Sequence, residues 1–221
     1  MNKEQIMMTA LDLFSQHGIK SVSMDDLARN MGISKRTIYE FFEDKETLLA
    51  EGIKYNHDKM KQVLNELEKG PYSVLEVIIL FYEEYMKRPR WYNRKFYDDL
   101  IRYPKALEKS EKSKADFSKL CMKLFTRGVK EGVIQKDINF EIVTLLAKEQ
   151  VKMIRPTGAF LNHSVSEVFK TILFTFLRGI CTEKGLAILD RYAFKQSHDL
   201  LWGNYNKVYI QNQIKFKWNE Y

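Results

Sequence analysis

Apolar side chains recur every three or four residues along most of the chain, and this spacing is what most limits the fold. Only four prolines and ten glycines occur among the 221 residues, so few positions interrupt a helix. Apolar residues at this spacing line one face of an α-helix, whereas a half-buried strand needs strict alternation. We therefore expect an all-α protein with helices over nearly the whole chain.

Capping residues and helix-breaking residues place the ends of these helices. Asn2 and Gln5 resemble a capping box, and Gly18 ends the first helix. The same reasoning applied along the chain predicts helices over about residues 2–17, 23–31, 34–42, 44–70, 73–86, 90–102, 105–131, 139–156 and 164–180. The pattern assigns no element after residue 180, and residues 202–221 lose the helical period, so the conformation of 199–221 stays open.

Composition indicates a soluble globular protein, with 45% hydrophobic and 29% charged residues. The apolar run that starts at Val77 ends at Tyr82, which is too short to cross a bilayer, and the N-terminus has no secretory apolar core. We therefore expect a cytoplasmic protein. Cys121 and Cys181 stand alone within helical patterns, so we expect free thiols and no metal site.

The net charge of +7 does not by itself indicate DNA binding. The first fifty residues contain six Lys or Arg and eight Asp or Glu, so this segment is slightly acidic. The basic surplus lies between Lys87 and Lys114. That stretch could indicate an anionic effector, but a solvated helix surface is the favoured interpretation.

Three short predicted helices open the chain, and the second and third are joined by Met31-Gly32-Ile33-Ser34. Gly32 can adopt the left-handed backbone that a tight turn needs, and Ile33 can fill the angle between the helices. This arrangement is typical of a helix-turn-helix. Capped short helices with a glycine turn also occur in bundles that do not bind DNA.

The segment from Ser34 to Leu49, preceded by Leu27 to Ile33, resembles the head of the TetR family of bacterial repressors. The resemblance implies a helix-turn-helix DNA-binding domain at residues 1–47 and a helical ligand-binding and dimerisation domain at 48–221. Two positions depart from the family pattern. Phe41 replaces a His or Tyr that could donate to a phosphate, and Asp44 replaces the commoner Ser or Asn.

The resemblance also implies which side chains contact DNA. Lys35 and Arg36 open the recognition helix, where each can donate to guanine O6 and N7. Four other donors match family positions that grip phosphates, namely Ser23, Thr37, Tyr39 and Lys45. Outside this motif, two adjacent cations would be interpreted as a solvated helix face and Tyr39 as a half-buried aromatic.

A dimer is expected because one recognition helix covers too few base pairs to hold an operator tightly. The interface candidates are the apolar residues of the last predicted helices: Ile142, Leu145, Leu146, Val165, Val168, Phe169, Ile172, Leu173 and Phe176. An ordinary core helix of a monomer has the same pattern. The family resemblance favours the dimer.

Aromatic residues are concentrated in the middle of the chain, where the family places a small-molecule pocket. The candidates are Tyr82, Tyr85, Trp91, Phe96, Phe117 and Phe125, although aromatic residues at helical spacing are more often plain core. In this interpretation an effector binds to the body and fixes a conformation in which the two recognition helices no longer match successive major grooves, so operator DNA is released.

An enzyme is not expected. No Glu-x-x-His precedes any of the four histidines, and there is no Gly-x-Ser-x-Gly, phosphate-binding glycine loop or dinucleotide motif, so we predict no catalytic residues and no cofactor. The alternative to a ligand-responsive repressor is an all-helical DNA-binding or scaffolding protein with no small-molecule ligand.

Overall fold

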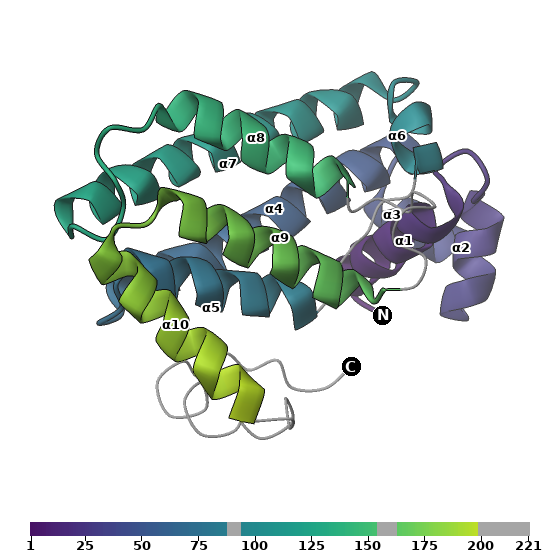
Figure 1. Cartoon of the computed structure of the whole chain (residues 1–221). Coiled ribbons are helices and arrows are strands. Elements are labelled where there is room, and N and C mark those ends of the chain that lie inside the picture. Colours follow the sequence, from purple (N-terminus) through teal and green to yellow (C-terminus); the bar gives the residue numbers. More distant parts are fainter. Residues whose placement is uncertain (88–93, 154–162, 199–221) are drawn as a thin grey trace.

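The computed structural model describes residues 1–87, 94–153 and 163–198, and these residues form an all-α fold (Figure 1). The helices are α1 (Lys3–His17), α2 (Met24–Met31), α3 (Lys35–Phe41), α4 (Lys45–Lys69), α5 (Val74–Lys87), α6 (Arg94–Leu100), α7 (Pro104–Lys130), α8 (Phe140–Met153), α9 (Val165–Ile180) and α10 (Glu183–His198). An isolated antiparallel bridge joins Ile134 and Cys181, and the described residues contain no strand. The prediction of an all-α protein is confirmed.

One helix, α10, was not expected from the sequence. Its first turn is held by Thr182, whose hydroxyl accepts from the Gly185 amide and whose carbonyl accepts from the Leu186 amide. Gly185 lies against the backbone, and a Cβ there would be 2.2 Å from the Val133 carbonyl oxygen. Leu189 is fully buried on the inner face. Glycine has a low helix propensity, so the helical pattern after Thr182 is weak in the sequence alone.

Two clusters of buried side chains form the interior, one at each end of the molecule (Figure 1). The first joins α1, α2 and α3 to the start of α4, to α6 and to Ala106 of α7. The second joins the end of α4 to α5, α8, α9, α10 and the end of α7. Leu48, Leu49 and Ile53 belong to the first cluster, so the predicted division between residues 47 and 48 passes through it.

Helix α6 and the first residues of α7 contact the N-terminal helices through backbone amides and carboxylates. The Lys20 amide donates to Asp99 Oδ2 at 2.7 Å, and the Lys105 amide donates to Glu46 Oε1 at 2.8 Å. Gly18 has a φ of 89°, and a Cβ there would be 2.9 Å from Lys95 Cβ. The loop after α1 therefore lies in direct contact with α6, which ends at Leu100, two residues before the predicted end at 102. The predicted start at residue 90 lies outside the described residues.

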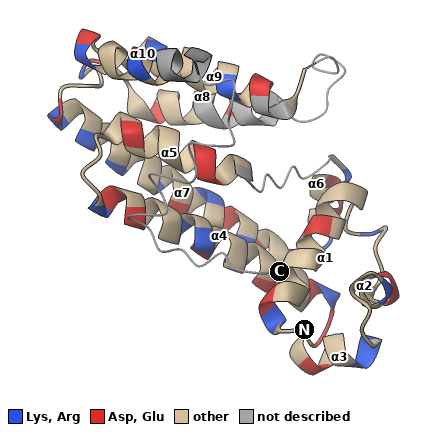
Figure 2. Cartoon of the chain, turned by 90° about the horizontal axis from the view of Figure 1, so that it is seen from below, with Lys and Arg blue, Asp and Glu red and all other residues tan. Residues whose placement is uncertain are grey.

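Figure 2 shows α2 and α3 at the end of the molecule away from α10, with acidic and basic residues intermixed along the helices. Within the described segments, no helix combines the length and the apolar character that a membrane span requires.

Candidate nucleic-acid interface

The turn between α2 and α3 is closed by backbone hydrogen bonds around a left-handed glycine. Gly32 has φ 63° and ψ 30°, as expected, and its amide donates to the carbonyls of Ala28 and Arg29. The Ile33 amide donates to Ala28 O at 3.0 Å. No atom lies within 4 Å of a Cβ built at Gly32, so backbone conformation alone requires glycine here.

Helix α3 starts at the expected cap and places two apolar side chains inside. The Ser34 hydroxyl accepts from the Thr37 amide at 3.0 Å. Ile38 and Phe42 are buried in the first cluster. Phe41, three residues after Ile38, would share their face in a regular helix, but it is 39% exposed. The helix ends at Phe41, and Phe42 takes an extended conformation that turns its ring inward.

Lys35 and Arg36 both lie on the exposed surface of α3, and each has an acidic neighbour. Lys35 Nζ is 2.8 Å from Asp25 Oδ2, and this hydrogen bond is the main reason that the pKa of Lys35 is raised. Arg36 Nε is 3.4 Å from Glu40 Oε1, and the Arg36 side chain is 88% exposed. Both side chains are open to solvent at this surface.

Tyr39 and Thr37 share the outer part of α3 with these cations. Tyr39 is 45% exposed, so nearly half of the residue is open to a ligand. Thr37 is partly buried, and its Oγ1 lies 2.9 Å from Ser34 Oγ. The short helix thus presents two cations and two hydroxyl groups.

The remaining two expected phosphate donors are engaged within the protein. The Ser23 hydroxyl donates to Asp26 Oδ2 at 2.6 Å and accepts from the Asp26 amide at 3.1 Å, which lowers the pKa of Asp26. Lys45 Nζ donates to the Ile19 carbonyl and lies 5.5 Å from the centre of the Phe14 ring. Burial lowers the pKa of Lys45. Both side chains stabilise the head in this conformation.

Asp44, one of the departures from the family pattern, still caps α4. Its Oδ1 accepts from the Thr47 amide at 2.6 Å, and this bond is the main cause of the lowered pKa of Asp44. An aspartate therefore performs here the capping that Ser or Asn would otherwise provide.

The expected dimer residues of α8 and α9 differ in their surroundings. Ile142, Leu145 and Leu146 of α8 are each more than half exposed, whereas the intervening Val143 and Thr144 are buried. On α9, Val168 is buried, and the half-buried residues are Phe169, Ile172, Leu173 and Phe176. Leu173 and Phe176 pack on the second cluster. The Val165 side chain lies outside the described residues. Helix α8 thus supplies the exposed apolar face.

The aromatic pocket candidates do not gather at one place. Tyr82 stacks on Phe169 with ring centres 5.0 Å apart, and Tyr85 is 6.2 Å from the same ring. Phe117 stacks on Phe81, and Phe125 stacks on Phe140. Phe96 packs in the first cluster with the head, and Trp91 lies outside the described residues.

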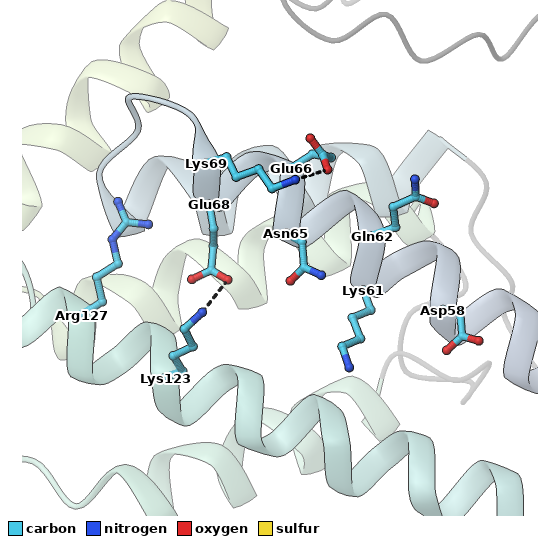
Figure 3. Close-up of a pocket in the computed structure, with 9 residues that line it drawn as sticks. All are labelled: Asp58, Lys61, Gln62, Asn65, Glu66, Glu68, Lys69, Lys123 and Arg127. Carbon is cyan, nitrogen blue, oxygen red and sulfur yellow. Dashed lines mark hydrogen bonds and ion pairs between the residues drawn. The ribbon is translucent and has the colours of Figure 1, made fainter.

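A hollow of about 610 Å³ lies between α4 and α7, and the sequence patterns did not predict it (Figure 3). Its lining is polar and charged: Asp58, Lys61, Gln62, Asn65, Glu66, Glu68 and Lys69 from α4, with Lys123 and Arg127 from α7. Lys69 pairs with Glu66 at 2.7 Å and Lys123 with Glu68 at 3.2 Å. None of the aromatic candidates lines it. Neighbouring charges of opposite sign give it no clear ligand preference.

Comparison with known proteins relates the first helices to regulatory proteins. Residues 6–51 match the family model described as bacterial regulatory proteins, tetR family. YuxN of Bacillus subtilis, an uncharacterized HTH-type transcriptional regulator, is 40% identical over 70 residues, which are 31% of this chain and 24% of YuxN. IcaR of Staphylococcus aureus, a negative transcriptional regulator of the icaADBC biofilm operon, is 27% identical over 73 residues, which are 33% of this chain and 39% of IcaR. The aligned parts thus span well under half of either relative.

A similarity to solved structures extends over most of the chain. A transcriptional regulator from Saccharomonospora viridis, solved in complex with choline, aligns with a TM-score of 0.62 over 82% of this chain and 98% of its own. The two are 17% identical, so this similarity concerns the fold.

Proposed function

The chain carries the DNA-binding head of the TetR family at residues 6–51, and on this premise we propose that it is a transcriptional repressor that binds palindromic operator DNA as a dimer. One observation carries the proposal. The short helix α3, set by the left-handed turn at Gly32, presents Lys35 and Arg36 at the surface.

Within this function, Lys35 and Arg36 read base edges in the major groove, where a guanine offers two acceptors to one cationic side chain. Tyr39 and Thr37 donate to phosphates and fix the register of the helix. Ser23 and Lys45 are assigned no phosphate, because the Ser23 hydroxyl donates its proton to Asp26 and the partly buried Lys45 donates to the Ile19 carbonyl. Lys35 and Arg36 differ in that both are exposed and pair only with exposed carboxylates.

Dimerisation is proposed to use the exposed apolar face of α8, formed by Ile142, Leu145 and Leu146. Three large apolar side chains close together on one helix favour burial against a second copy. A two-fold axis at this face would present two copies of α3 to the two halves of a palindrome.

Release by a small-molecule effector is also part of the proposal. Its support is the protein of the same fold that was solved with choline. The candidate contacts are Tyr82 and Tyr85, whose rings both pack on Phe169. The alternative is a DNA-binding or scaffolding protein without such a ligand. Thermal unfolding of the full chain with a metabolite panel separates the two, since a bound effector raises the melting temperature.

DNA selection from random duplexes tests the main proposal. Wild type should select a palindrome, Arg36→Ala should relax its base preference at a cost of about 1–3 kcal/mol, and Tyr39→Phe should weaken all sequences alike. Leu145→Glu should give a monomer with much weaker operator binding. Equal binding by wild type, Arg36→Ala and Tyr39→Phe would contradict the proposal.

A further inference from the structure

Acidic side chains stand directly beside both cations that are proposed to read DNA. Asp25, on α2, contacts Lys35 at 2.8 Å, and Glu40, one turn along α3, lies 3.4 Å from Arg36. All four residues are exposed. The two carboxylates therefore belong to the surface that is proposed to face the duplex.

Each carboxylate acts against DNA binding in two ways. It occupies a cation that would otherwise neutralise a phosphate, and it brings negative charge toward the phosphate backbone. Loss of an exposed ion pair changes an equilibrium constant by about fivefold or less. A bidentate guanine contact discriminates by about fivefold to more than a hundredfold. A guanine edge can thus outweigh the loss of one carboxylate partner, whereas a phosphate contact carries no sequence information.

We propose that Asp25 and Glu40 are specificity-determining residues, which keep Lys35 and Arg36 from phosphates on random DNA and release them to guanine edges in the operator. This inference rests on the proposed function. On random DNA the pairs stay closed and the two cations neutralise no phosphate. The first fifty residues carry more acidic than basic side chains. With both ion pairs closed, the head therefore has little remaining electrostatic attraction for a duplex.

The test compares the full-length Asp25→Asn/Glu40→Gln variant with wild type. The matched control is Asp58→Asn/Glu66→Gln, which makes the same charge change at two exposed ion pairs of α4, with Lys54 and Lys69. Dissociation constants are measured for a random-sequence duplex and for the selected operator between about 50 and 200 mM salt, because phosphate contacts appear as a salt slope.

Removal of the two carboxylates should tighten random-duplex binding by about tenfold at low salt. The logarithmic salt slope should steepen by roughly 0.9 for each cation that reaches a phosphate. Operator binding should tighten less, so the ratio of operator to random affinity falls. The control should leave that ratio unchanged. Melting temperatures equal to that of wild type establish that both variants are folded.

Three outcomes would overturn the proposal: unchanged random-duplex affinity, an equal gain on both DNAs, or the same loss of selectivity in the control. A loss of operator affinity in Asp25→Asn alone would also overturn it, because Asp25 would then itself read a base. Failure of the proposed function looks different, since wild type would then select no palindromic site at all.

Discussion

The head and the body of this protein complete their interiors in different ways, although their helices begin alike. Ser23 and Ser34 cap head helices by accepting a hydrogen bond from an amide three residues further on, and Ser164 caps α9 of the body in the same way. The interior of the head, however, is completed by Phe96 and Leu100 of α6, which lie far from the head in sequence. The interior of the body is built from α5, α8, α9 and α10 with the ends of α4 and α7. The head therefore depends on a helix outside its own part of the sequence.

This difference can be tested by removing one large ring from each cluster. Phe96→Ala should lower the free energy of unfolding by about 3–5 kcal/mol, because Phe96 is fully buried in the first cluster although it belongs to α6. Phe125→Ala, in the second cluster, is the matched variant. Urea unfolding followed by circular dichroism measures both. If Phe96→Ala leaves the unfolding of the head unchanged, α6 does not support the head.

A smaller effect is expected at the turn that sets α3. Gly32→Ala should lower the free energy of unfolding by about 1–2 kcal/mol, because alanine resists the positive φ at this position. Gly179→Ala is the control, since Gly179 lies in α9 with open space around its Cβ position and no positive φ. The control should be neutral or slightly stabilising. Equal losses in both variants would show that the turn carries no special backbone constraint.

The smallest expected effect is on the stability of the protein at low pH. Hydrogen bonds to the Thr47 amide lower the pKa of Asp44 in the folded state, so its stabilising contribution is present above the unfolded value of about 3.9 and is lost as pH falls through the lower folded value. Thermal unfolding between about pH 2 and 6 should show less acid destabilisation for Asp44→Asn than for wild type. A pH dependence unchanged in Asp44→Asn would contradict this assignment.

Residues with local roles were predictable from the sequence. Ser34 as a cap and Gly32 as a left-handed turn follow from side-chain chemistry and backbone sterics within four residues. The exposure of Phe41 does not follow from helical spacing, because α3 ends at this residue and Phe42 takes an extended conformation.

Residues whose surroundings come from distant segments were not predictable. Lys45 turns inward toward Ile19, and Phe96 joins the head although it lies in α6. Periodicity shows that a side chain is buried or charged, but it does not show which helix lies opposite. The hollow between α4 and α7 escaped prediction for the same reason.

The continuity of α4 has a geometric consequence. Its 25 residues run without a break from one interior cluster to the other, a length of about 37 Å at 1.5 Å per residue. If α4 tilts as a rigid body by about 5° about its C-terminal end, its N-terminal end is displaced by about 3 Å. A small tilt of α4 that begins in the C-terminal half would therefore shift the surface that is proposed to meet the duplex.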